Sequence, residues 1–282
     1  MTKSDRSSGK TCVMAAPNGA RLVPDDHAAV PVTIAQTIET TVACRAQGAQ
    51  ALHAHVRDDQ LLHCLDTDRY RALISGLETA LGKNFPVQVT TEAVGRYSTD
   101  EQMQLVRDLK PRYISAAVRE FIPDDSDVNA AADFYRWCVQ NQVGVQHIIY
   151  DDNDLQRYFD YKTAEVIPLE HQSVLIVLGR YVKDQLSDPS LVDHFAKALE
   201  GHDLRWMLCA FGHTETQCLV KGAQHGAGCR VGFENNRLHP DQTIAESNEE
   251  RVATLLSEIK ASTVSLATEE DIHFWLGGYA NA

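Results

Sequence analysis

The sequence predicts an α/β fold in which eight parallel strands, each followed by a helix, close into a single barrel. Three observations support this prediction. Short apolar segments and amphipathic segments alternate along the whole chain. The connections between them have ordinary lengths, and no linker rich in Pro, Gly and Ser divides the chain. The length of 282 residues suits a (β/α)8 barrel, which typically takes about 250 residues.

The predicted strands are short runs of apolar and β-branched residues bounded by turn residues. The first ends at Pro17, Asn18 and Gly19. The run at 173–179 is the clearest, because an unbroken apolar strand suits a parallel sheet covered on both faces. The eight strands are predicted at residues 12–16, 52–58, 86–92, 113–118, 143–150, 173–179, 205–211 and 228–234.

The predicted helices carry apolar residues at helical spacing and begin at capping residues. Ser98 and Glu101 form a capping box, and Gly48 is a stop signal at the end of the first helix. The acidic run at 124–127 is interpreted as a helix cap and not as a calcium loop. The eight helices are predicted at residues 31–48, 66–82, 98–109, 124–138, 152–166, from 188 onward, 215–223 and 244–259.

We expect one domain over residues 1–282, with residues 1–10 as a disordered tail. A doubly wound open sheet is the alternative fold. No G-x-G-x-x-G motif follows the first strand, so a dinucleotide site has no support.

Composition limits the partners. A formal net charge of −13 argues against nucleic acid or an anionic membrane as the main partner. Seven cysteines without a CxxC pair are typical of a reduced, intracellular chain. With no apolar leader at the N-terminus and no long apolar run, the sequence predicts a cytoplasmic protein.

The strand at 52–58 carries the first chemical signal. Side chains alternate along a strand, so His53, His55 and Arg57 should share one face. Buried polar groups need partners, and a metal ion is the obvious partner for two imidazoles. Two hydrogen-bonded histidines at a strand end are the alternative.

The strand at 228–234 has the same design, with Arg230 and Glu234 on its inner face. Both strands flank the first one, and the carboxyl ends of barrel strands meet at one mouth, so Glu234 should approach His53 and His55. Two imidazoles and one carboxylate with an open position are typical of catalytic zinc. A structural ion pair with an arginine is the alternative for Glu234.

Together, the motifs His-Ala-His-Val-Arg-Asp at 53–58 and Arg-Val-Gly-Phe-Glu-Asn-Asn at 230–236 resemble the β-keto acid cleavage enzyme family, whose named type is the 3-keto-5-aminohexanoate cleavage enzyme. Residues 17–20 and 246–248 support the likeness, which covers almost the whole chain. The resemblance implies a zinc-dependent TIM barrel, usually a homotetramer. Such an enzyme converts a β-keto acid and acetyl-CoA into acetoacetate and a new acyl-CoA.

By position, the resemblance assigns one Zn²⁺ per subunit to His53, His55 and Glu234. Arg230 matches the family's active-site arginine, which suits an enolate or a carboxylate. The family also has a hydroxyl residue near the substrate, where this chain has Thr90 and Thr91. Strand alternation favours Thr90.

Two positions depart from the family. Arg21 replaces a glutamate that meets the substrate ammonium in the aminohexanoate-cleaving members, which favours an anionic or neutral substrate tail. Asn235 replaces the aspartate that serves as the base, and an amide cannot take up a proton near neutral pH. Glu92 and Glu120 are the candidates to replace it.

The candidate substrate-binding residues are Asn18, Arg21, Ser115 and Asn235, and the candidate catalytic residues are Arg230, Glu92, Glu120 and Thr90. His147 is interpreted as a hydrogen-bonded core or mouth histidine and not as a fourth ligand. Two alternative functions stay open. One is a metal-dependent aldolase or lyase that acts on a keto acid without CoA, and the other is a metal- and anion-binding barrel without turnover.

Overall fold

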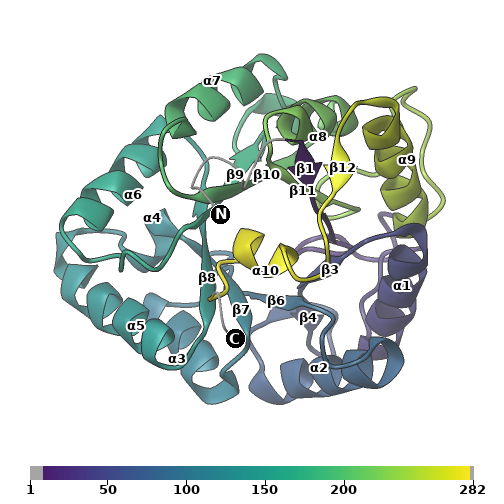
Figure 1. Cartoon of the computed structure of the whole chain (residues 1–282). Helices are drawn as coiled ribbons and strands as arrows, with labels where there is room; N and C mark the ends of the chain where they lie inside the picture. The colour runs from purple at the N-terminus through teal and green to yellow at the C-terminus, as the bar shows by residue number, and fades with distance from the viewer. Residues whose placement is uncertain (1–8, 280–282) are drawn as a thin grey trace.

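Eight parallel strands close into a barrel in the computed structural model of the chain, which describes residues 9–279 (Figure 1). Their order around the barrel is β10-β11-β2-β3-β6-β7-β8-β9. The strands are β2 Val13–Ala15, β3 Ala51–Ala54, β6 Val87–Thr90, β7 Tyr113–Ala117, β8 Gly144–Ile149, β9 Ser173–Leu178, β10 Arg205–Ala210 and β11 Gly228–Val231. The predicted barrel is confirmed, and the open sheet is not formed.

The helices surround the barrel, as Figure 1 shows, and pack on the outward side chains of the strands. Thr33 and Ser98 both form capping boxes at helix N-termini. Asp124, in the acidic run, accepts a hydrogen bond from the Ser126 N–H and caps a short 3₁₀ helix, Asp125–Asp127. The helices are α1 Ile34–Gln47, α2 Thr67–Leu81, α3 Thr99–Leu109, α4 Val118–Phe121, α5 Val128–Gln140, α6 Asp152–Thr163, α7 Ser190–Leu199, α8 Glu215–Gln224 and α9 Asn248–Ala261.

The two ends of the described chain meet at the amino-terminal end of the barrel. Strands β1 (Lys10–Thr11) and β12 (Ser265–Leu266) pair in parallel. Helix α10 (Ile272–Trp275) lies across the barrel opening (Figure 1), and Trp275 is buried among apolar residues of the barrel interior. These elements were not predicted. Residues 1–8 of the expected tail lie outside the described residues, but Lys10 belongs to a strand, so the predicted boundary at residue 10 was too late.

No helix among residues 9–279 is long and apolar enough to cross a bilayer. All seven cysteines are buried and free.

His147, on β8, lies between the sheet and the outer helices. Its ring is 5.0 Å from that of Tyr135, 5.3 Å from that of Tyr158 and 5.5 Å from that of His171, measured between centroids. Its two nitrogens have no hydrogen-bond partner within residues 9–279. His147 is therefore a core histidine and not a ligand at the mouth, and the hydrogen bond expected for it is absent from this part of the chain.

These buried histidines should make the protein less stable in acid. Burial, helped by the nearby Lys162 ammonium, lowers the pKa of His171 to about 3. Between pH 6.5 and about 3 the unfolded chain therefore binds a proton that the folded chain does not. The free energy of unfolding should fall by about 1.4 kcal/mol per pH unit for this histidine as the pH drops through that window.

Urea unfolding of the wild type and of His171→Gln at several pH values between 7 and 4 measures this effect. We expect a weaker pH dependence in the variant, whatever its stability at pH 7. Identical pH dependence in the two proteins would show that His171 is protonated equally in the folded and unfolded states.

Candidate active site

A pocket with a cavity volume of about 50 Å³, open to solvent at its mouth, lies at the carboxyl ends of the barrel strands. Eight of the residues that the sequence nominates line it: Asn18, Arg21, His53, His55, Thr90, Glu92, Arg230 and Glu234. Ile148, Tyr150, Val177, Arg180 and Phe211 complete the side that faces them. The pocket therefore combines an apolar wall with a dense set of charged and imidazole side chains.

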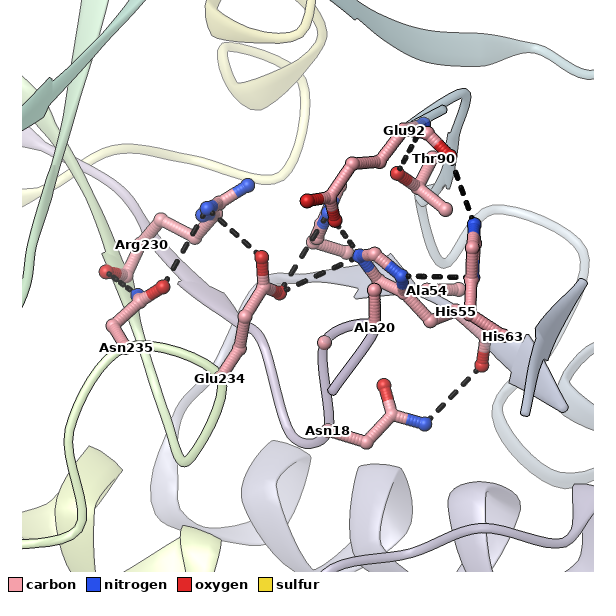
Figure 2. Close-up of polar contacts among 12 residues, drawn as sticks. Asn18, Ala20, Ala54, His55, His63, Thr90, Glu92, Arg230, Glu234 and Asn235 are labelled. Atoms are coloured by element: carbon pink, nitrogen blue, oxygen red, sulfur yellow. Dashed lines mark hydrogen bonds and ion pairs between the residues drawn. The ribbon is translucent and has the colours of Figure 1, made fainter. Parts of the chain in front are cut away.

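Three potential metal ligands converge at the base of this pocket. Nε2 of His53 lies 3.2 Å from Nε2 of His55. Oε2 of Glu234 lies 3.7 Å from the first nitrogen and 3.8 Å from the second. Figure 2 shows the Glu234 carboxylate between Arg230 and the imidazoles. Strands β3 and β11 bring these groups together because both neighbour β2.

The backbone around the histidines differs from the predicted continuous strand. Strand β3 ends at Ala54, and β4 (Val56–Arg57) leaves the barrel to pair antiparallel with β5 (His63–Cys64). The prediction that the two imidazoles share a side is nevertheless confirmed. Arg57, on β4, does not line the pocket with the two histidines. It donates to the carbonyls of Gly19 and Ala20 instead, so it shapes the loop after β2.

Hydrogen bonds that end at a backbone carbonyl set the tautomer of His53. Gln146 Nε2 donates to the Trp275 carbonyl, and Gln88 Nε2 donates to Gln146 Oε1. Oε1 of Gln88, 2.9 Å from Nδ1 of His53, must then accept a proton from that nitrogen. The lone pair of His53 therefore lies on Nε2, which faces Glu234.

A second chain of hydrogen bonds does the same for His55. Nε2 of His63 lies 2.9 Å from the Glu92 carbonyl and donates to it, which leaves Nδ1 of His63 as an acceptor. Nδ1 of His55, 3.4 Å away, then carries its proton, and its lone pair lies on Nε2. Burial lowers the pKa of His53, His55 and His63, so all three rings are neutral near pH 7.

The three ligand atoms fit a divalent cation. Two nitrogen lone pairs and a carboxylate oxygen face one another within 4.8 Å. Oε2 of Glu234 is buried and has no hydrogen-bond partner among the described residues. Such an arrangement is repulsive unless a cation lies between the atoms, and outer hydrogen bonds that fix each imidazole are typical of metal sites.

Two glycines place Glu234. Strand β11 ends at Val231, three residues before the predicted end, because Gly232 has a φ of +146° and begins a turn. A methyl group there would collide with the Ala16 carbonyl. A methyl group at Gly19, where φ is +56°, would lie 2.5 Å from Cγ of Glu234. The carboxylate thus reaches the histidines from a turn, not from a strand.

Arg230 is held beside the carboxylate. Its Nη2 lies 3.1 Å from Oε1 of Glu234 and 3.5 Å from Oδ1 of Asn235. Asn235 also donates to the Arg230 carbonyl, so it contacts both the guanidinium and the backbone of the arginine. Nε of Arg230 is buried without a partner in the described chain, which leaves it available for an anionic oxygen.

Glu92 lies on the opposite side of the pocket, in the loop after β6. Its carboxylate accepts a hydrogen bond from Arg180, at 3.1 Å. Sequence reasoning missed Arg180. The available signal was its place directly after the predicted strand at 173–179, at the end of the barrel where active sites form.

Thr90 lines the pocket, as strand alternation favours, whereas the hydroxyl of Thr91 donates to the Ser115 carbonyl. Glu120 lies on α4 outside the pocket, and its carboxylate accepts from the Ala93 N–H and from Gln102.

Of the four predicted substrate-binding residues, Asn18 and Arg21 line the pocket, whereas Ser115 and Asn235 do not. Ser115 is buried in β7, and its hydroxyl has no partner within the described chain. Asn18 lines the pocket, but its amide group donates to the carbonyls of Pro31 and His55, so its role is mostly to hold the loop.

Comparison with known proteins agrees with this geometry. The model of a family described as "beta-keto acid cleavage enzyme" matches residues 10–277. The 3-oxoadipate:acetyl-CoA acetyltransferase of Cupriavidus necator is 24% identical over 258 residues, which cover 84% of this chain and 82% of that protein. The 3-keto-5-aminohexanoate cleavage enzyme of Fusobacterium nucleatum is 24% identical over 269 residues, 93% of this chain and 96% of its own.

Solved structures show the same fold at lower identity. The ternary complex of ObcA with a C4-CoA adduct and oxalate superposes with a TM-score of 0.66 at 14% identity, over 88% of this chain and 67% of that one. Apo ObcA gives a TM-score of 0.63 at 15% identity, over 88% of this chain and 66% of that one. The chain thus spans about two thirds of the ObcA length.

Proposed function

The chain belongs to the beta-keto acid cleavage enzyme family, and from this premise we propose that it condenses a β-keto acid with acetyl-CoA to give acetoacetate and a new acyl-CoA. The family match confirms the resemblance carried by the two strand motifs. The observation that carries the proposal is the convergence of two imidazole lone pairs and an unpartnered carboxylate oxygen beside Arg230 in an open pocket.

His53, His55 and Glu234 would hold one Zn²⁺ per subunit. Two nitrogens and one oxygen with an open position are the donors that catalytic zinc prefers. When bound, the ion would act as a Lewis acid toward the ketone oxygen of the substrate. Arg230 would bind the negative charge that develops on the substrate oxygens, through its free Nε.

The reaction balances with one carboxylate base. C2 of the keto acid loses a proton to Glu92, and the resulting enolate attacks the thioester carbonyl of acetyl-CoA, which expels CoA thiolate. The thiolate attacks C3 of the condensed acid, and the bond between C2 and C3 breaks. The new acyl-CoA forms, and the acetoacetate enolate takes its proton back from Glu92.

Glu92 is preferred as the base because it lines the pocket, while the Glu120 carboxylate is occupied by a backbone N–H and an amide. Thr90 would hold the loop that carries Glu92, since its hydroxyl oxygen accepts from the Glu92 N–H at 3.1 Å. Asn235 would fix Arg230 in place of serving as a base.

The pocket rim favours an anionic substrate tail. Arg21 is exposed there, with no ion-pair partner among the described residues. One relative is named for 3-oxoadipate, a keto acid with a second carboxylate. The predictions of a homotetramer and of a cytoplasmic location remain part of this proposal.

A screen of β-keto acids with and without acetyl-CoA tests the function. We expect consumption of at least one acid that requires acetyl-CoA and yields an equal amount of new acyl-CoA. Consumption without acetyl-CoA would instead identify the aldolase or lyase alternative.

A further inference from the structure

The ion pair between Arg180 and Glu92 lies inside the pocket. Their side chains are only 13% and 19% exposed, and the Nη2–Oε1 distance is 3.1 Å. The two residues come from opposite sides of the barrel mouth, the loop after β9 and the loop after β6. The pair therefore spans part of the space that a substrate must enter.

Arg180 is held in place but is not saturated. Its guanidinium stacks on the Phe211 ring, 5.3 Å from the ring centroid. Gly179 before it has a φ of +84° and packs against Ser187, which fixes the start of the loop. Glu92 is the one side chain within residues 9–279 that pairs with its guanidinium, so other N–H groups of the planar fork can receive a second carboxylate.

The charges of the pocket leave room for two anionic groups. Three arginines line it (Arg21, Arg180 and Arg230) against two glutamates (Glu92 and Glu234). A divalent cation between the proposed ligands raises the positive excess further. One substrate carboxylate beside that cation would leave the arginine side of the pocket undercompensated.

We propose that Arg180 binds the distal carboxylate of a β-keto dicarboxylic acid and that this contact frees Glu92 to act as the base. The inference rests on the proposed function and adds its substrate class. A substrate carboxylate bound to the Arg180 guanidinium competes with Glu92 for that positive charge. Glu92 is then free to move toward the substrate, so the tail carboxylate promotes turnover as well as binding.

The test compares a β-keto dicarboxylic acid with its distal monoamide, which has the same length and no distal charge. Losing a charge-assisted hydrogen bond to the substrate lowers kcat/KM by about 10- to 100-fold. The wild type should prefer the diacid by about this factor in kcat/KM, with both a lower KM and a higher kcat. Arg180→Met should bring the ratio close to 1, because only the diacid loses a partner for its distal carboxylate.

Two further variants make the result decisive. Arg180→Lys keeps the charge without the planar fork and should restore part of the preference. Arg21→Met removes the exposed rim arginine and should lower the preference less than Arg180→Met does. The inference is overturned if Arg180→Met lowers both substrates equally, or if Arg21→Met alone removes the preference.

The outcomes also separate this inference from the proposed function. Wild-type enzyme that cleaves the monoamide as well as the diacid, both with acetyl-CoA, would overturn only the role of Arg180. Wild-type enzyme that forms no acyl-CoA from any β-keto acid would overturn the function itself. Circular dichroism and metal content of each variant control for misfolding.

Discussion

Replacing Glu92 by Gln should lower kcat by about 10²- to 10⁴-fold, the usual contribution of a positioned general base. The amide keeps the size of the side chain and can still accept from Arg180, but it cannot take the C2 proton. Metal content should not change, because Glu92 is not among the three converging ligands. Steady-state kinetics together with elemental analysis measure both quantities.

Glu120→Gln is the matched control. Its carboxylate accepts from the Ala93 N–H and from Gln102, so an amide there should disturb the loop and cost far less activity. If Glu120→Gln loses turnover and Glu92→Gln does not, the role of base moves to Glu120. If both variants keep near wild-type kcat, this proton-transfer scheme is wrong. Asn235→Asp should keep or raise activity, since it restores the family's carboxylate.

The double variant His53→Ala, His55→Ala should lose both bound metal and all metal-dependent turnover. Of the three proposed ligands only Glu234 remains, and a single carboxylate binds zinc too weakly for the ion to stay bound through purification. Inductively coupled plasma mass spectrometry of the purified protein measures the metal directly.

A control for histidine content is available on the surface. His194 and His225 are exposed and pair with Asp152 and Asp193. Their double alanine variant should keep full metal occupancy. Full occupancy in the His53, His55 variant would refute the ligand assignment, whatever its activity.

The barrel and the convergence of His53, His55 and Glu234 could be predicted from strand patterns and from the order of strands that a closed barrel imposes. Strand alternation puts two imidazoles of one motif on one side, and barrel order places β3 and β11 beside β2. Strand alternation did not predict where β11 ends. Gly232 ends β11 early through its positive φ, and Glu234 reaches the site from the turn that follows.

The residues that the sequence did not reveal depend on contacts between distant segments. His63 orients His55 through a two-stranded sheet outside the barrel, and Arg180 meets Glu92 across the mouth. The spacing of residues along the sequence does not indicate which distant residues form such pairs. Alternation also gives the side of a strand but not the depth along it, and Ser115, a predicted binding residue, lies away from the pocket.

Acetyl-CoA labelled with ¹³C in both acetyl carbons tests the central claim most directly. In the proposed reaction the acetyl group becomes C3 and C4 of acetoacetate, and the new acyl-CoA takes its acyl carbons from the unlabelled keto acid. Mass spectrometry of the two products should therefore find both labelled carbons in acetoacetate and none in the new acyl-CoA. Unlabelled acetoacetate, or keto acid consumed while acetyl-CoA stays intact, would contradict the account.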